Sequence, residues 1–267
     1  MNAIPEFQAI CENAVHAAGE ILVQSMGHVR VQEKGPSDLV TEADFAAQET
    51  VRRIVLTAFP EHCLLGEEGP RGSDPREEYR WIVDPLDGTT NYVHGIPFFA
   101  VSLALERQGE VLVGAVYNPV TKECFTAAAG CGAFLNGRPI HTSSVADLRG
   151  AVGAVGLPAM VRRDSPDLLV FLEAIHACQS IRRTGSAALN MAYVAAGRMD
   201  LFWSYSTKIW DVAAASLVLR EAGGVISATD GGVFELEDAH FLVAANASLH
   251  EQLQEIVRKA LRPLLPG

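Results

Sequence analysis

The chain of 267 residues is 49% hydrophobic and 20% charged, which is typical of a soluble globular protein with one large domain or two small ones on a shared core. A formal charge of −11 and the absence of any Lys/Arg run argue against a nucleic-acid partner. No apolar stretch approaches the roughly 20 residues that span a bilayer, so we expect no membrane association. Five scattered cysteines without a CxxC pair predict reduced thiols and a cytoplasmic location.

The first sixty residues predict two helices. Apolar residues recur at helical spacing between positions 4 and 25. Residues 34–40 have the composition of a loop. A second helix is expected to start at Thr41, because Asp44 stands three residues later and the two can form a capping box. For Asp44, a purely capping role and a role near a metal ion both remain open.

The most informative stretch is residues 81–91, with the sequence WIVDPLDGTTN. Residues 81–83 predict a buried strand that ends on Asp84, and Asp87 stands directly before the Gly-Thr-Thr segment 88–90. Small and hydroxyl-bearing residues are typical of a loop that leads into a helix N-terminus, where backbone N–H groups bind phosphate. Because two carboxylates would repel a phosphate, the stretch predicts a divalent metal ion held by Asp84 and Asp87.

Two further acidic residues stand at the ends of predicted elements. Glu67 and Glu68 follow a short apolar run, and since neighbouring side chains of a strand face opposite ways, only one can face a given site. We expect that residue to be Glu67. Asp211 lies in the first turn of a helix predicted from Ile209, where helix capping alone would also explain it.

The order of the predicted elements indicates the fold class. Strands joined by short turns predict an antiparallel sheet in the first half, whereas helices and strands alternate from about Asp147, without the regular rhythm of a doubly wound fold. We therefore predict an α+β layered architecture. Its halves, 1–146 and 147–267, are expected to form one functional unit with the site between them. Further strands are expected near Val233 and at 241–244, and a capping box at 248–251 predicts the start of the last helix.

The predicted ligand set consists of oxygen donors. Glu67, Asp84, Asp87 and Asp211 provide the carboxylate-rich set that suits Mg²⁺ or Mn²⁺. The eight histidines are dispersed and none pairs at i,i+4, which argues against a zinc site.

Two segments together resemble the signature motifs of the inositol monophosphatase family: residues 84–91 (DPLDGTTN) and 210–214 (WDVAA). Residues 38–44 (DLVTEAD), 66–68 (GEE) and 221–224 (EAGG) are similar to its flanking motifs. The resemblance covers nearly the whole chain, in the same order and at family-like spacing. It implies a layered αβαβα sugar-phosphatase fold, usually dimeric, and a Li⁺-sensitive phosphatase activity.

The resemblance also implies a metal site of two to three Mg²⁺ ions. Glu67, Asp84 and the carbonyl of Leu86 would hold one ion, and Asp84, Asp87 and Asp211 a second. Glu67 would help to hold a weaker third ion, with Asp44 nearby through water.

The implied substrate site uses the loop after the second acid. Thr89, through its hydroxyl group, would orient the attacking water together with Glu67, while the N–H groups of residues 88 and 89 would bind the phosphate. The segment 185–187 matches the part of the family that contacts the sugar. The implied substrate-binding residues are Asp87, Gly88, Thr89, Thr90, Gly185, Ser186, Ala187, Ser204 and Asp211.

One position departs from the family pattern. Inositol-specific members carry a Glu seven residues before the second motif's Asp, where this chain has Ser204, which cannot make the same charge-assisted hydrogen bond. Trp203, Tyr205 and Lys208 either shape a different pocket or only pack against the strand.

Several functions therefore remain open. We expect a Mg²⁺-dependent phosphomonoesterase of a small polyol or sugar phosphate, with inositol monophosphate as the leading substrate. The alternatives are fructose-1,6-bisphosphate, histidinol phosphate and 3′-phosphoadenosine 5′-phosphate. A hypothesis of another class is an accessory protein that uses the fold as a scaffold in a transcription complex.

Overall fold

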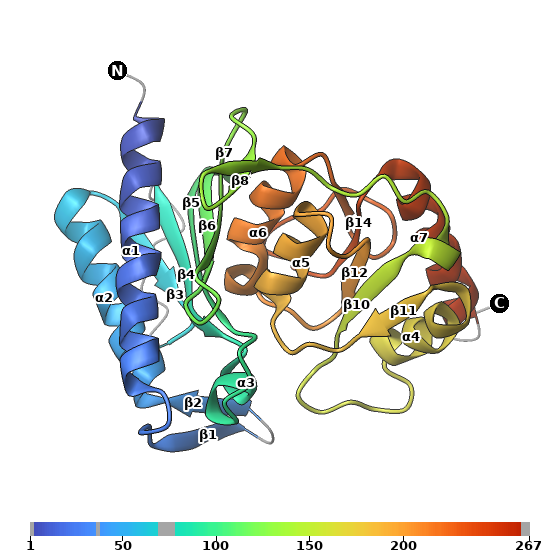
Figure 1. Ribbon diagram of the computed structural model, residues 1–267, viewed down its shortest axis with the longest axis horizontal. Helices are drawn as coiled ribbons and strands as arrows, with labels where there is room; N and C mark the ends of the chain where they lie inside the picture. The colour runs from blue at the N-terminus through green and yellow to red at the C-terminus, as the bar shows by residue number, and fades with distance from the viewer. Residues whose placement is uncertain (1–2, 36–37, 69–77, 263–267) are drawn as a thin grey trace.

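The computed structural model describes residues 3–35, 38–68 and 78–262. Helices and sheets alternate in five layers, α-β-α-β-α, from one side of the molecule to the other (Figure 1). The outermost layer on one side contains helices α1 (Ile4–Ser25) and α2 (Glu42–Ala58), as predicted. A short hairpin of β1 (Val31–Gly35) and β2 (Asp38–Thr41) joins them, so that part of the segment expected to be a loop is strand.

The first sheet has seven strands in chain order, and only the first pair, β3 and β4, is parallel. The antiparallel hairpins follow from tight turns such as Gln108-Gly109, where both residues adopt a positive φ, of 52° and 89°. The strands are β3 (Cys63–Gly66), β4 (Arg80–Asp87), β5 (Ala100–Arg107), β6 (Glu110–Asn118), β7 (Glu123–Ala128), β8 (Ala133–Leu135) and β9 (Arg138–Ile140).

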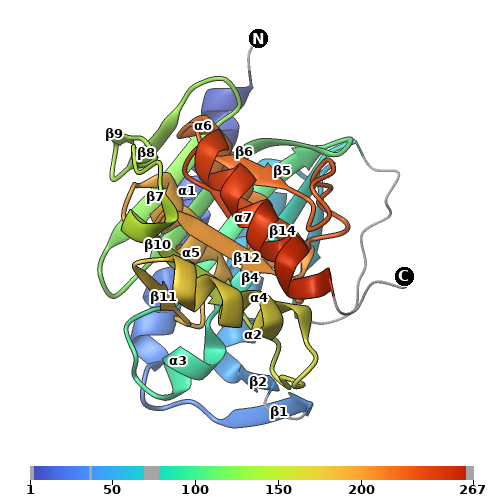
Figure 2. The ribbon, with the colours of Figure 1, turned by 90° about the vertical axis from the view of Figure 1, so that its right-hand side faces the viewer.

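The second sheet is mixed, with β10 parallel to both of its neighbours and β14 antiparallel to β12 and β13. Its strand order is β11-β10-β12-β14-β13. The strands are β10 (Val152–Gly156), β11 (Ser180–Arg182), β12 (Leu201–Ser204), β13 (Val225–Ser227) and β14 (Phe241–Ala244). Helices α4 (Pro166–Ala177) and α7 (Ala247–Leu261) cover its outer face, toward the viewer in Figure 2.

Helices α5 (Ala187–Ala195) and α6 (Ile209–Glu221) form the middle layer between the two sheets. A helix in this position has apolar neighbours all round, and ten of the 13 residues of α6 are buried. A Cβ atom added at Gly114 of β6 would lie 2.9 Å from both Cα and O of Ala214. The backbone of α6 therefore lies directly on the first sheet, because position 114 has no side chain.

Three details differ from the sequence-based expectations. Helix α7 begins two residues before the predicted capping box, because Asn246 caps it by accepting a hydrogen bond from the Leu249 N–H at 3.1 Å. Val233 is 84% exposed and belongs to no strand. Asp84 does not end its strand, since β4 continues to Asp87. No helix in the described ranges combines the length and the apolar character needed to cross a membrane.

Candidate metal and phosphate site

A bulge in β4 turns its two acidic residues toward the same side. Asp84 pairs with Ser102 of β5 and Asp87 with Ala100, so two residues of β4 lie opposite one residue of β5. Without this extra residue, side chains three positions apart would face opposite sides of the sheet. Both carboxylates instead face the middle layer, where Asp87 bonds to α5 and the charge of Asp211 on α6 acts on Asp84.

Asp87 is held at the N-terminus of helix α5. Its carboxylate accepts hydrogen bonds from the Ser186 hydroxyl at 2.5 Å and from the N–H groups of Ala187 and Ala188 at 3.1 and 2.7 Å. The first backbone N–H groups of a helix have no acceptor within the helix, so a carboxylate there satisfies them. Ser186, predicted to contact substrate, thus positions an acid about one hundred residues away in the chain.

Asp211 takes its place from the start of helix α6. Its carboxylate accepts a hydrogen bond from the Lys208 N–H at 2.7 Å, which is the capping role that the sequence left open. Its charge also acts on the buried carboxyl group of Asp84. Asp211 therefore both caps α6 and belongs to the acidic cluster.

Glu67 extends beyond the end of β3 beside β4, with its N–H donating to the Val83 carbonyl at 3.2 Å. Its negative charge acts on Asp84, Asp87 and Asp211. Glu68 is buried at a different place, where its backbone exchanges two hydrogen bonds with the Gln48 amide. The alternation argument that selected Glu67 over Glu68 agrees with this arrangement.

The acidic residues raise one another's pKa. Burial, followed by the charges of Glu67, Asp87 and Asp211, raises the pKa of Asp84 well above its usual range. Burial and the charge of Asp87 raise the pKa of Asp211 to about 8. Burial raises the pKa of Asp87 to about 6, although three hydrogen bonds oppose the shift. Buried acids that raise one another's pKa are typical of a functional site, where a bound cation would favour their ionised forms.

The loop after Asp87 depends on glycine. Gly88 has a φ of 96°, and a Cβ atom there would lie 3.1 Å from the Phe98 carbonyl and 3.2 Å from the Gly185 carbonyl. The short helix α3 (Thr89–Val93) starts directly after it. The Thr89 hydroxyl donates to the Leu86 carbonyl at 3.1 Å, so the predicted metal-ligand carbonyl and the predicted water-orienting hydroxyl are in contact.

A pocket of about 610 Å³ lies between the acidic cluster and the second sheet. Its walls come from both halves of the chain, and include the segment 155–159 and residues 183–187. Seven of the predicted site residues line it: Asp87, Thr90, Gly185, Ser186, Ala187, Ser204 and Asp211. Ser204 is fully buried, and its hydroxyl donates to the Gly156 carbonyl at 3.5 Å.

Sequence reasoning missed several residues of this pocket. Asn91 stands inside the recognised motif, and its amide donates to the carbonyls of Phe98 and Thr184 at 2.6 and 2.7 Å, which ties α3 to the segment before α5. Arg183 is exposed at the pocket and is the only Lys or Arg among the described lining residues. The motif could have indicated Asn91, but no local pattern marks Arg183.

Four predicted neighbours of the site are not among the described residues that line the pocket. Asp44 is fully buried and forms the predicted capping box, because the N–H and hydroxyl of Thr41 donate to it at 2.9 and 2.6 Å. Trp203 is fully buried and donates to the Asp167 carbonyl at 3.4 Å. Neither Trp203, Tyr205 nor Lys208 is among the described residues that line the pocket.

The donor set fits a hard divalent cation. Mg²⁺ prefers carboxylate and carbonyl oxygens, and the cluster offers the carboxylates of Asp84, Asp87 and Asp211 close to the Leu86 carbonyl. Among the described residues, none of these three acids forms an ion pair with Lys or Arg, so a bound cation would supply the missing charge. In the same ranges, no group of three or more His, Cys, Asp or Glu side chains is arranged so that it could hold a metal ion without a change of side-chain positions.

Residues 5–262 match the model of the inositol monophosphatase family. The inositol-1-monophosphatase of Rhizobium meliloti (strain 1021) is 43% identical over 252 residues, which cover 93% of this chain and 94% of that protein. The Nus factor SuhB of Pseudomonas aeruginosa is 40% identical over 264 residues, which cover 96% and 97%. The crystal structure of the extragenic suppressor protein suhB from Bartonella henselae has a TM-score of 0.91 at 38% identity and covers 95% of this chain and 99% of that chain.

Proposed function

Because the chain belongs to the inositol monophosphatase family, we propose that it is a Mg²⁺-dependent phosphomonoesterase of a small polyol or sugar phosphate. The phosphomonoesterase class follows from the family. The observation that carries the metal-dependent mechanism is the meeting of four acids beside one pocket: Glu67 after β3, Asp84 and Asp87 of β4, and Asp211 of α6. Acids that raise one another's pKa in this way are suited to holding Mg²⁺, or alternatively Mn²⁺.

The residues divide between two main ions. In this proposal Glu67, Asp84 and the Leu86 carbonyl hold one ion, and Asp84, Asp87 and Asp211 hold the second, with a weaker third ion near Glu67. When bound, such ions lower the pKa of water and neutralise the charge of the phosphoryl oxygens. Asp44 is proposed to act through water, although its carboxylate also caps α2.

The protein's own groups position the reactants. The N–H groups of Gly88 and Thr89 are proposed to bind the phosphate, and the Thr89 hydroxyl, with Glu67, to orient the water. Phosphoryl transfer needs mainly positioning and charge neutralisation, so no covalent nucleophile is required. The hydrogen bonds from α5 support the proposed role of Asp87 as a metal ligand. They fix its carboxylate without neutralising it by a Lys or Arg side chain.

The substrate end of the pocket is neutral and rich in hydroxyl groups. Ser204, Ser206 and Thr207 line it together with the segment 157–159, and residues 185–187 with Thr90 complete the proposed contacts. Hydroxyl groups can donate to or accept from the hydroxyls of a sugar or polyol. Inositol monophosphate is therefore the leading substrate, although the absence of a carboxylate at position 204 argues against strict selectivity for it.

Arg183 favours two of the three alternative substrates. An arginine at the pocket could bind a second phosphate group in a bidentate manner, which a monophosphate does not offer. Fructose-1,6-bisphosphate and 3′-phosphoadenosine 5′-phosphate carry such a group, whereas histidinol phosphate does not. The ranking of bisphosphates against monophosphates therefore tests the role of Arg183.

A scaffold role in a transcription complex is the second candidate function. The observation that favours it is the similarity to a relative named Nus factor SuhB. All four acids are present, so this role would accompany catalysis and not replace it. A pull-down with the tagged chain tests it, and failure to recover a stoichiometric partner would count against it.

We also propose that the chain acts as a cytoplasmic homodimer, without nucleic-acid or membrane partners of its own. The formal charge of −11 supports the lack of a nucleic-acid surface. Light scattering coupled to size-exclusion chromatography would give the mass of the assembly, and a monomeric mass near 28.6 kDa would contradict the dimer.

The decisive experiment measures phosphate release from sugar, polyol, amino-alcohol and nucleotide phosphates, with Mg²⁺, with EDTA, and with Mg²⁺ plus Li⁺. We expect release that requires Mg²⁺ and is inhibited by Li⁺, with inositol monophosphate ranked first. The absence of release from every substrate would contradict the phosphatase proposal and favour the scaffold.

A further inference from the structure

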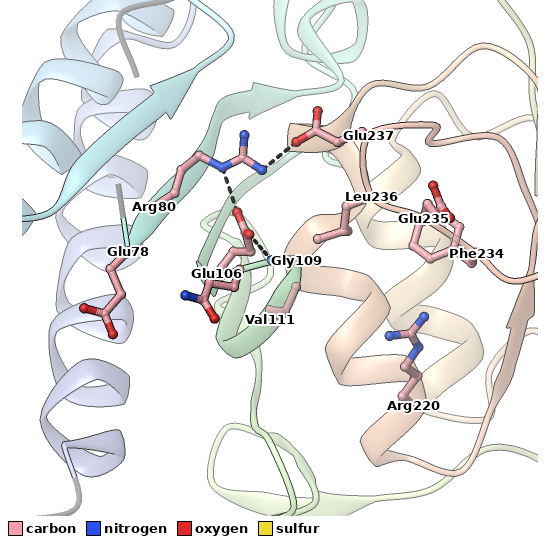
Figure 3. Close-up of a pocket in the computed structure, with 11 residues that line it drawn as sticks. Glu78, Arg80, Glu106, Gly109, Val111, Arg220, Phe234, Glu235, Leu236 and Glu237 are labelled. Carbon is pink, nitrogen blue, oxygen red and sulfur yellow. Dashed lines mark hydrogen bonds and ion pairs between the residues drawn. The ribbon is translucent and has the colours of Figure 1, made fainter. Parts of the chain in front are cut away.

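A second cavity, of about 740 Å³, lies at the opposite end of β4 from the acidic cluster (Figure 3). Arg80, the first residue of β4, lines this cavity, whereas Asp87, the last, lines the catalytic pocket. The seven intervening steps of strand correspond to about 23 Å at roughly 3.3 Å per residue. The described lining residues of the two cavities do not overlap. The second cavity is therefore a separate feature of the molecule.

The negative charge of this cavity is partly neutralised. Glu106 accepts a hydrogen bond from Arg80 Nε at 2.7 Å, and Glu237 accepts one from the other end of the same guanidinium at 2.6 Å, so these two carboxylates share one positive charge. Glu78 forms an ion pair with Arg107 at 2.5 Å. Glu235, the fourth glutamate of the lining, is exposed to solvent, which screens its charge. An anion in this cavity would therefore depend on the charge of Arg220.

Arg220 is the second arginine that lines the cavity, and unlike Arg80 it has no carboxylate partner among the described residues. It extends from the last turn of α6, and its guanidinium lies 5.7 Å above the centre of the Phe234 ring. In residues 3–35, 38–68 and 78–262 the guanidinium has no hydrogen bond or ion pair with a carboxylate. Its five N–H donors are therefore open to a ligand. Partial burial lowers the pKa of Arg220, which shows that its charge lies in a poorly solvated place.

The surface next to Arg220 is apolar. Val111 of β6, Phe234 and Leu236 line the cavity beside it, and Phe234 is itself buried (Figure 3). Pockets for small organic ligands combine such apolar walls with a few polar groups that fix the orientation. A charge-assisted bond from a guanidinium is the strongest of these groups for an oxyanion.

We propose that this cavity is a binding site for a small organic anion, whose carboxylate or phosphate-like group pairs with Arg220 and whose apolar body lies against Val111, Phe234 and Leu236. The cavity and the acidic cluster share two elements. Strand β4 carries Arg80 and Asp84, and helix α6 carries Arg220 and Asp211. The site is distinct from catalysis and does not depend on the proposed phosphatase activity.

Binding can be measured on the full chain after its metal ions are removed with EDTA and the EDTA is dialysed away, and the Arg220→Gln variant separates this cavity from the pocket at Arg183. The probes are benzoate for a carboxylate and phenylphosphonate for a phosphate-like group, with neutral benzamide as the matched control. We expect saturable binding of at least one anion by calorimetry, and at least tenfold weaker binding of benzamide. The tighter anion identifies the preferred group.

Variants locate the binding site. Arg220→Gln should weaken binding of the anion at least tenfold, and Arg149→Gln, at an exposed arginine outside the cavity, should leave it unchanged. Leu236→Asp should weaken binding by placing a negative charge beside the ligand. Circular dichroism on each variant verifies that it is folded. The proposal is overturned if neither anion binds up to its solubility limit, or if Arg220→Gln binds the anion as the wild type does.

Discussion

At the scale of single residues, the acidic cluster contributes to function at the expense of stability. Asp84 is 2% exposed and close to three other acids, so its ionised form is unfavourable without a cation. Asp87 avoids part of this cost through three hydrogen bonds from α5. The proposed metal binding would account for this arrangement, whereas packing alone would favour apolar side chains here.

Replacing Asp84 with Asn should abolish turnover, because it removes charge from the proposed ligand shared by two ions. The same change should raise the melting temperature in EDTA, since it relieves repulsion within the cluster. Steady-state kinetics and thermal unfolding check both effects, with Asp164→Asn, an exposed acid, as the control. A variant that keeps more than a tenth of the wild-type kcat would contradict the metal assignment.

Replacing Ser204 with Glu should raise kcat/KM for inositol monophosphate relative to other phosphates, because a carboxylate can accept a charge-assisted bond from a ring hydroxyl. Ser204 lines the pocket and already lies close to Gly156, so the longer side chain has to extend toward the cavity. The competition of two substrates in one assay measures the ranking, with Ser204→Ala as the control. An unchanged ranking would show that position 204 does not set specificity.

At the scale of elements, helix ends and close contacts position the site. Helix α5 presents its N-terminus to Asp87, and α6 carries Asp211 in its first turn. The predicted start of α7 was wrong because the prediction used only the Ser-x-x-Glu pattern at 248–251 and did not consider the residues before it. Asn246, two residues earlier, also donates to the Val145 carbonyl at 2.8 Å, so a contact distant in sequence helps to fix the first turn.

The position of this cap can be tested by two substitutions. Asn246→Ala should reduce the free energy of unfolding by about 1 kcal/mol, because the Leu249 N–H loses its acceptor. Ser248→Ala should cost less than half as much, since within the described part of the chain this exposed hydroxyl caps no N–H of the helix and makes only two long bonds of 3.3 Å, donating to the Ala146 carbonyl and accepting from the Gln252 amide. Urea unfolding measures both values. Equal losses, or a larger loss for Ser248→Ala, would restore the predicted capping box.

The contact between α6 and the first sheet should not tolerate a side chain. Gly114→Ala would place a methyl group 2.9 Å from the Ala214 backbone, so the helix has to move. We expect a loss of roughly 1–3 kcal/mol in the free energy of unfolding, as for other overpacked cores, and a lower kcat because α6 carries Asp211.

Gly150→Ala is the matched control, because its nearest neighbour, a methyl group of Val145, would lie at an ordinary 3.5 Å. Urea unfolding and phosphate release would be measured on both variants. A Gly114→Ala protein with wild-type stability would contradict the close contact seen here.

At the scale of the whole molecule, two cores are built around shared elements. One lies between α1, α2 and the outer face of the first sheet, and the other extends from its inner face through α5 and α6 to the second sheet. The acidic cluster lies where β4 and α6 meet, so bringing the layers together also brings the acids together. The stability of the metal-free molecule should therefore depend on pH through this cluster.

In EDTA, the contribution of the cluster to stability should fall as pH rises. Asp87 and Asp211 have folded-state pKa values of about 6 and about 8, above the usual value of 3.8. The folded state thus binds more protons than the unfolded state between pH 4 and 8, and ionisation in this window destabilises it. Melting temperatures across this range should show a larger Mg²⁺-induced increase at pH 8 than at pH 5. An increase that does not depend on pH would contradict the proposed link between the acids and the metal.

The sequence by itself determined the layered α+β class, most of the element positions, and the identity of the four acids. These features are local: hydrophobic periodicity sets helices and strands, and the phosphate loop needs its acid, glycine and hydroxyl residues within eight positions, 84–91. Only the tertiary structure decided how the acids converge. The bulge in β4, the three donors of α5 to Asp87, the presence of Arg183 at the pocket and the cavity at Arg220 all join residues far apart in the chain. Such contacts depend on how layers pack, and no local pattern encodes them.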